Sequence, residues 1–312
     1  MLWIGIDASI WIVQCEAIFW GPQHAQAGEN LELHTLLFCV AHLLQCALIP
    51  VFVFDGKLHP SMKCGKKAPG EAEAELAHMN QAGIIDAIIT EDNDVLIFGA
   101  KLILCRPSGL KTGSGKKAKA DSDLYNLYLA DHICSSENIQ LMQGRLFLFA
   151  ILLGGDYANG LQGCGQKTTH VLCQTDLGDS LLTAVTVMGP IVLDNFLVGW
   201  RMWLQSELLN PTIGRASRCL ALENKLPDDF LNPQVLRLYA LPVTSWSIQH
   251  TPPNAEQWKP PLPDISRIAI FCDSFFHWEP DVWLKCLHKN VWPGIVIHSL
   301  YQMSTLSKYK PA

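Results

Sequence analysis

The sequence predicts an α/β fold built on a mainly parallel sheet, and three observations predict it. Short apolar segments of strand length alternate with longer segments of helix length as far as about residue 105. Three of these short segments lead into an acidic residue. From about residue 143 the pattern becomes mostly helical. Strands that alternate with helices are typical of a mainly parallel sheet covered by helices on both faces.

The single elements follow from periodicity and from the residues that start and stop each segment. The expected strands are Leu2–Ile6, Val51–Phe54, Asp86–Thr90 and Lys101–Cys105. The expected helices are Ala8–Ala17, Leu31–Cys46, Glu71–Gln81, Gln143–Leu153 and Ile265–His288, with a further long helix through Trp200 and Trp203. Polar loops are expected at Lys57–Gly70 and Arg106–Ala120.

The apolar stretch Thr35–Phe54 has about the length of a membrane span. His42, Gln45 and Pro50 interrupt it, which favours a buried helix followed by a strand after Pro50. The N-terminal segment is also apolar, but it lacks a basic start and contains two acids, unlike a signal peptide. No membrane association is therefore expected.

The composition indicates which kind of binding partner and which cellular compartment to expect. The formal net charge of −6 alone argues against a nucleic-acid partner, yet ten of the 23 basic residues fall between Lys57 and Lys119. The eleven cysteines are scattered and form no C-x-x-C pair. They indicate reduced thiols, hence a cytosolic or nuclear protein, and no zinc site.

Seven carboxylates form the candidate catalytic and metal-binding set. In parallel sheets ligands bind beyond the carboxyl ends of strands, and Asp7, Asp55 and Asp92 each follow such an end. Two-metal hydrolysis of a phosphodiester needs carboxylates that hold two ions about 4 Å apart. Mg²⁺ takes oxygen ligands and keeps several waters, so some acids act through water. The set is Asp7, Asp55, Glu71, Glu73, Asp92, Asp94 and Asp156.

Each acid also has a plain structural interpretation. Asp7 could cap a helix, and Glu71 and Glu73 could simply favour a helix N-terminus. The two acids after the third strand could cap the turn that follows. Gly154–Asp156 could be an ordinary helix end. These explanations account poorly for the joint occurrence of all seven.

Five short motifs then carry a resemblance to a known family. They are Ile6-Asp7-Ala8-Ser9, Phe54-Asp55-Gly56, Ala68-Pro69-Gly70-Glu71-Ala72-Glu73-Ala74, Thr90-Glu91-Asp92-Asn93-Asp94 and Gly155-Asp156-Tyr157. In this order they resemble the acid motifs of the flap endonuclease/XPG family of structure-specific nucleases, which has a PIN-like fold. The segment Leu148–Tyr157 and the Pro- and Trp-marked C-terminal part look closest to its Holliday-junction resolvase branch. The resemblance covers residues 1 to about 175, and the remainder loosely.

The resemblance implies an endonuclease that uses two Mg²⁺ or Mn²⁺ ions and cuts flapped or branched DNA in repair or recombination. It also implies a nuclear location. No nucleotide cofactor is expected, because the chain has no true phosphate loop. Directly or through water, the first ion would be served by Asp7, Asp55, Glu71 and Glu73, and the second by Asp92, Asp94 and Asp156.

The turn Gly160–Lys167 looks like the family's helix-two-turn-helix element, in which backbone carbonyls hold a K⁺ ion against a DNA phosphate. Glycines allow close backbone approach, and amides at a helix start favour an anion. The DNA-binding candidates are therefore Gly163, Gly165, Lys167 and Thr168. A plain glycine-rich connection between two helices is the alternative.

Two parts of the family pattern are missing. The chain starts at Met1-Leu2-Trp3 instead of Met-Gly-Ile and a helix. Only fifteen residues separate Asp55 from Glu71, where the family has several dozen that form a basic helical arch and a strand. Fifteen residues reach at most about 53 Å, enough for a connection but not for an arch. Four lysines remain there, either as a partial electrostatic substitute or as a solvated loop: Lys57, Lys63, Lys66 and Lys67. A catalytically impaired DNA-binding relic or isoform is therefore the alternative to an active enzyme.

The expected organisation is a nuclease core at residues 1–175 followed by a mostly helical extension at residues 176–312.

The run Gly113-Ser114-Gly115-Lys116-Lys117 resembles a phosphate loop only superficially, because Lys117 replaces the hydroxyl that would bind Mg²⁺. Four tryptophans are expected in the core rather than as base-stacking platforms: Trp200, Trp203, Trp278 and Trp292. The sequence leaves the oligomeric state open.

Overall fold

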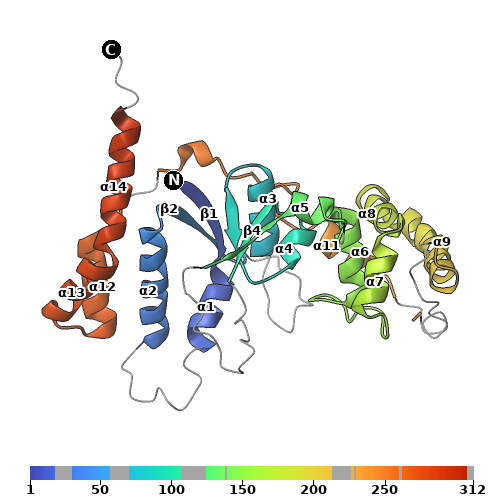
Figure 1. Cartoon of the computed structure of the whole chain (residues 1–312), viewed down its shortest axis with the longest axis horizontal. Helices are drawn as coiled ribbons and strands as arrows, with labels where there is room; N and C mark the ends of the chain where they lie inside the picture. The colour runs from blue at the N-terminus through green and yellow to red at the C-terminus, as the bar shows by residue number, and fades with distance from the viewer. Residues whose placement is uncertain are drawn as a thin grey trace. The chain divides into compact units, whose positions relative to one another are not determined.

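The computed structural model describes residues 1–17, 30–56, 70–106, 124–137, 139–212, 226–227, 230–259 and 262–307. The predicted loops Lys57–Gly70 and Arg106–Ala120 lie outside these residues except for Gly70 and Arg106, as do the lysines of the first loop and the run at 113–117. Figure 1 shows the elements, which are β1 (Leu2–Asp7), α1 (Ala8–Ala17), α2 (Leu31–Gln45), β2 (Leu48–Val53), α3 (Ala72–Gln81), β3 (Ala87–Ile89), α4 (Asp94–Ile97), β4 (Leu102–Cys105), β5 (Asn126–Leu129), α5 (Ala130–Ser135), α6 (Gln143–Leu153), α7 (Gln166–Cys173), α8 (Leu177–Val187), α9 (Pro190–Leu209), α11 (Pro233–Ala240), η2 (Ala255–Gln257), α12 (Ile265–Phe276), α13 (Pro280–Asn290) and α14 (Trp292–Ser307).

The strands form a mostly parallel sheet in the order β2-β1-β3-β4-β5. Strand β1 pairs in parallel with both β2 and β3, and β4 pairs antiparallel with β5. Helices make up most of the remaining described chain. The predicted α/β class is therefore confirmed, and the helix Gln143–Leu153 has the predicted bounds.

Packing divides the chain into two compact units that alternate along the sequence. The first comprises Met1–Phe54, Gly83–Ile89 and Pro253–Ala312, and the second comprises Asp55–Ala82 and Thr90–Pro252. These units do not test the predicted division of the chain near residue 175, which stays a prediction.

In the first unit, helices α13 and α14 pack against α2, as Figure 1 shows. Ala41, Leu287 and Val291 form the centre of this contact. The segment Ile265–His288 is helical, as the sequence predicts, but the structure divides it into two helices, α12 and α13. His277 adopts a left-handed conformation with φ 50°, which ends α12, and a proline then opens α13.

Strand β2 begins earlier than the sequence predicts and contains Pro50. The register pairs Leu2 with Leu48 and Ile4 with Pro50. Since β2 is an edge strand, the missing N–H of proline can face away from the sheet without costing a ladder hydrogen bond. The stretch Thr35–Phe54 thus holds a helix, a turn and a strand. No helix in the described ranges combines the length and the apolar character needed to cross a membrane.

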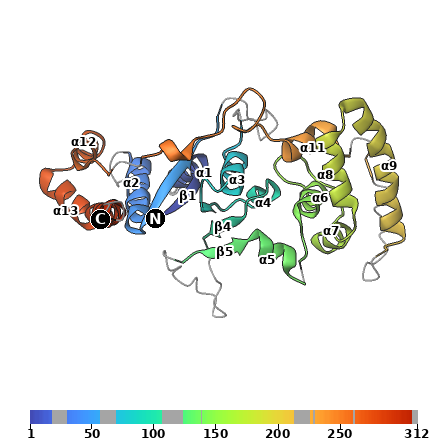
Figure 2. The ribbon, with the colours of Figure 1, turned by 90° about the horizontal axis from the view of Figure 1, so that it is seen from above.

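In the second unit, helices α6, α7, α8 and α11 pack together, and α9 packs on α8 (Figure 2). Trp200 of α9 is 2% exposed, and its indole N–H donates to the carbonyl oxygen of Leu177 at 3.0 Å. The predicted core role is confirmed for this tryptophan. It is wrong for Trp203, which is 37% exposed on the same helix.

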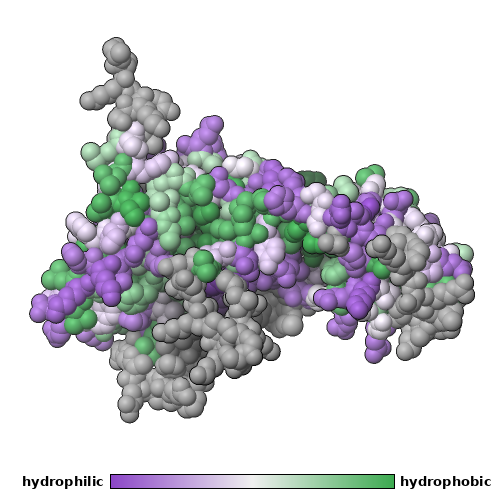
Figure 3. Space-filling model, viewed as in Figure 1, coloured by the Kyte–Doolittle hydropathy of each residue, from purple (hydrophilic) through white to green (hydrophobic). Residues whose placement is uncertain are grey.

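The core role is also wrong for Trp292 of the first unit, which is 48% exposed. This residue begins α14, a helix that leaves several apolar side chains at the surface, among them Leu300 and Met303. Figure 3 shows hydrophobic side chains gathered over α14. A tryptophan therefore does not by itself identify a core position in this chain.

Asn80 ties α3 to the start of β4. The side chain is 4% exposed, and its Oδ1 accepts the amides of Lys101 at 2.7 Å and Leu102 at 3.1 Å. We expect Asn80→Ala to lower the free energy of unfolding by about 2 kcal/mol, because it leaves two amides without their acceptor. Urea denaturation measures this loss. Asn210→Ala, at an exposed position, is the control, and an equal loss in both variants contradicts the prediction.

Candidate active site

Asp7 is the last residue of β1 and lies in the first unit. It is 2% exposed, and its Oδ1 accepts the amides of Ser9 at 2.7 Å and Ile10 at 3.3 Å. The capping role considered from the sequence is therefore confirmed. The other six candidate acids belong to the second unit, so the assignment of Asp7 to the same site stays a prediction.

Three of the six acids meet at the N-terminus of α3. The Oδ1 of Asp55 accepts the amide of Ala72 at 3.0 Å, and Gly70 adopts φ 59° where the chain turns into the helix. Glu71 is the N-cap residue, and Glu73 lies in the first turn. These two glutamates are only 4% and 5% exposed. Negative charge is favoured at a helix N-terminus, so the helix dipole helps to hold buried carboxylates here.

Two further acids flank the start of α4. The amide of Asp94 donates to Oδ1 of Asp92 at 2.9 Å, and the amide of Asp92 donates to Oγ1 of Thr90 at 3.0 Å. The capping alternative thus holds for Asp92. One carboxylate oxygen can cap a turn while the other stays available, so this hydrogen bond is compatible with a metal-binding role.

Asp156 and Tyr157 follow the end of α6. Gly154 closes the helix with φ 88°, which confirms the predicted helix end. The Tyr157 side chain is 6% exposed, and its hydroxyl donates a hydrogen bond to the carboxylate of Glu71. Burial, and then the negative charge of Glu71, hold the pKa of Tyr157 far above its ordinary value, so the phenol stays protonated as a donor.

Tyr239 of α11 joins the acids from a distant part of the sequence. Its ring packs edge-on against Tyr157, with ring centroids 4.6 Å apart at 76°. Burial, and then the charges of Asp94 and Asp156, raise the pKa of Tyr239 well above its ordinary value. Glu71, Asp94 and Asp156 therefore lie within electrostatic reach of one buried tyrosine pair.

Tyr239 was missed by the sequence analysis. The spacing of Val235, Leu236 and Tyr239 marks a buried helix face, and all three are buried. That spacing predicts burial only. Nothing in it indicates which residues this face contacts.

All the candidate donors are carboxylate oxygens, which suit Mg²⁺ or Mn²⁺. Within the described parts of the chain, no three Asp, Glu, His or Cys side chains converge as a ready-made metal cage. Mg²⁺ is held through one or two carboxylates and keeps several waters. The acids at α3 and those near Asp94 and Asp156 therefore fit a water-rich metal site better than a closed cage.

The turn Gly160–Lys167 connects α6 to α7 in the second unit. Gly160 and Gly163 adopt φ 69° and φ 93°, while Leu161 and Cys164 are buried and anchor the turn. The exposed residues include Gly163, Gly165, the N-cap of α7, and Lys167, and Thr168 is half-buried. Exposed glycines and an exposed lysine thus lie at a helix start, where an anion can be bound.

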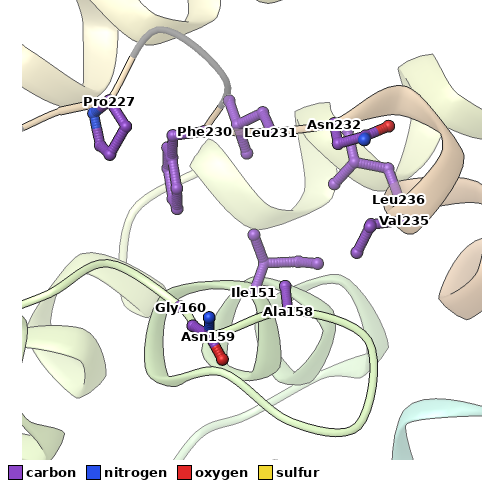
Figure 4. A pocket seen from close by; sticks show the side chains of 10 residues that line it. All are labelled: Ile151, Ala158, Asn159, Gly160, Pro227, Phe230, Leu231, Asn232, Val235 and Leu236. Carbon is purple, nitrogen blue, oxygen red and sulfur yellow. The ribbon is translucent and has the colours of Figure 1, made fainter. Parts of the chain in front are cut away.

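A pocket of about 260 Å³ lies beside this turn, between the end of α6 and the start of α11 (Figure 4). Figure 4 shows Ile151 and Ala158 on one side and Phe230, Leu231 and Leu236 on the other. The lining is mainly apolar and contains none of the candidate acids. The pocket and the acid cluster are therefore different places in the second unit.

Comparison with known proteins independently supports the resemblance to flap endonuclease/XPG nucleases that the acid motifs indicate. Residues 66–156 match the XPG I-region, the segment that carries five of the seven candidate acids. Exonuclease 1 of Drosophila melanogaster is 27% identical over 221 residues, which is 65% of this chain and 29% of that protein. Flap endonuclease 1 of Ignicoccus hospitalis is 28% identical over 153 residues, which is 43% of this chain and 42% of that protein.

The chain is also similar to the solved structure of a nuclease. The Holliday junction-resolving enzyme GEN1, crystallised with product DNA and Mg²⁺, aligns with a TM-score of 0.69 and 29% identity over 94% of this chain and 70% of that chain. The chain is therefore similar to nucleases of the flap endonuclease/XPG family, and residues 66–156 carry the match to the XPG I-region. Its similarity to a junction-resolving enzyme agrees with the branch that the sequence predicts, and the PIN-like fold class is confirmed. The chain spans less than half the length of the curated relatives named above.

Proposed function

We propose that this chain is a divalent-metal-dependent DNA endonuclease that hydrolyses phosphodiester bonds at flaps or four-way junctions during repair or recombination. One observation carries the proposal. Acids that follow three different segments of the chain, Glu71, Asp94 and Asp156, lie within electrostatic reach of the same buried tyrosine pair. Carboxylates held close together repel one another, and bound divalent cations would relieve that repulsion.

In this chemistry the protein's carboxylates would hold the metal ions in position. Asp55, Glu71 and Glu73 would hold one ion and Asp92, Asp94 and Asp156 the other, with Asp7 as a further candidate for the first ion. When bound, two Mg²⁺ or Mn²⁺ ions supply water activation and stabilisation of the leaving oxygen. The Tyr157 hydroxyl fixes the Glu71 carboxylate, and the start of α3 stabilises its charge.

A cleavage panel tests the proposal. The purified full chain is incubated with labelled flap, four-way and linear duplexes in Mg²⁺, Mn²⁺ or EDTA. Cleavage near the branch point, in either metal but not in EDTA, is the expected result. No cleavage of any substrate in either metal contradicts the proposal.

The turn Gly160–Lys167 is proposed to hold a DNA phosphate, with K⁺ as its partner ion. Lys167 is exposed on the first turn of α7, so Lys167→Ala removes a charge without disturbing the core. We expect about fivefold weaker binding of a four-way junction in Ca²⁺ and a salt dependence reduced by about one counterion. Fluorescence anisotropy at several NaCl concentrations measures both. Lys285→Ala, on exposed α13, is the control, and equal effects of the two variants contradict the role of Lys167.

The shortened connection between Asp55 and Glu71 motivates one alternative function. Loss of a positive group that faces the scissile phosphate removes several kcal/mol of stabilisation from the transition state. The chain would then bind junctions without cutting them. Tight, salt-sensitive binding with no cleavage in the panel above distinguishes this relic from an active enzyme. In either case we propose a nuclear location, as expected for a DNA repair nuclease.

A further inference from the structure

The hydroxyl of Tyr239 is a buried donor beside the acids. The residue is 3% exposed, and within the described part of the chain its hydroxyl has no hydrogen-bond partner. The backbone amide of Tyr157 acts on this oxygen as a donor, so it supplies no acceptor for the hydroxyl's own hydrogen. A buried hydroxyl with no partner is unfavourable, so a group that completes this position is expected.

The hydroxyl points toward the segment that carries Asp156. A Cβ added at Gly155 would lie 2.5 Å from the Tyr239 hydroxyl oxygen and 3.8 Å from its Cζ. Asp94 and Asp156 are the charged groups that act most strongly on this hydroxyl. The absence of a side chain at residue 155 therefore lets α11 bring a hydrogen-bond donor close to the second group of acids.

We propose that Tyr239 is a positioning residue whose hydroxyl donates, through a shared water, to the carboxylates of Asp94 and Asp156 and so orients them for a divalent ion. This inference rests on the proposed function, because it assumes that these acids bind metal. It assigns a part of the candidate site to α11, which lies far along the chain from every acid motif. Hydrogen bonds to the ligands of a metal orient them and raise its affinity.

A steric cycle tests the placement without any metal. Gly155→Ala should lower Tm by about 4 °C, because its Cβ collides with the hydroxyl oxygen. In a Tyr239→Phe background the nearest ring atom is the carbon at 3.8 Å, so the same substitution should cost almost nothing. An equal loss of Tm in both backgrounds overturns the proposed placement.

Isothermal titration of the full chain with Mn²⁺ tests the positioning role. Tyr239→Phe keeps the ring and removes only the donor, so we expect Mn²⁺ binding about tenfold weaker with an unchanged or raised Tm. Tyr128→Phe, at an exposed tyrosine of β5, should bind like the wild type. If the wild type binds Mn²⁺ and Tyr239→Phe binds it equally well, the role of Tyr239 is overturned while the proposed function stands. If the wild type binds no Mn²⁺, the proposed function itself fails, and this inference fails with it.

Discussion

Asp94→Asn is expected to reduce the single-turnover cleavage rate by about a thousandfold, the scale seen when one electrostatic contribution to a transition state is removed. Asparagine keeps the shape of the side chain but loses the charge that holds a cation. Asp94 begins α4 and lies within electrostatic reach of Tyr239, so it belongs to the group around the buried tyrosine pair. The rate is measured on a labelled four-way junction with enzyme in excess.

Two controls separate the effect of the lost charge from an effect on folding. Asp131→Asn makes the same change at an exposed position on α5, and it should cleave at the wild-type rate. The Tm of Asp94→Asn should be unchanged or higher without metal, because the substitution relieves repulsion between carboxylates. Wild-type cleavage by Asp94→Asn contradicts its role, as does a comparable loss in Asp131→Asn.

Trp200→Ala is expected to lower the free energy of unfolding by about 4 kcal/mol, the usual cost of truncating a buried large aromatic side chain. The indole is 2% exposed, and it links α9 to α8 through its hydrogen bond to Leu177. Equilibrium urea denaturation of the full chain measures the loss.

Trp203→Ala is the matched control, because it truncates the same residue type three positions along the same helix. Its side chain is 37% exposed, so we expect a cost below about 1.5 kcal/mol. Similar losses in both variants would mean that the packing of α9 on α8 is not centred on Trp200.

The alternation of strands and helices made the sheet predictable, because each buried strand is a short apolar run with distinct boundaries. The start of β2 was less predictable. Pro50 indicates the end of regular structure, yet an edge strand tolerates it and the register with β1 continues past it. Local sequence does not tell whether a strand is central or at an edge, so the boundary was misplaced.

The acids could be singled out as candidates because each stands in a local motif, whereas Tyr239 could not. Asp55 meets the start of α3 within a short stretch of sequence, and a turn-forming glycine, Gly70, marks the place. Tyr239 reaches Tyr157 only through the packing of α11. The break at His277 was missed for a similar reason, since a left-handed residue other than glycine leaves little signal in the sequence.

Counting bound Mn²⁺ ions by electron paramagnetic resonance tests most directly whether these carboxylates form a metal site. The signal of free Mn²⁺ is followed during titration of the full chain, for the wild type and for Asp94→Asn. We predict two bound ions per wild-type chain and loss of at least one of them in Asp94→Asn. Equal binding by the two proteins, or no binding by the wild type, would contradict a divalent-metal site built from these acids.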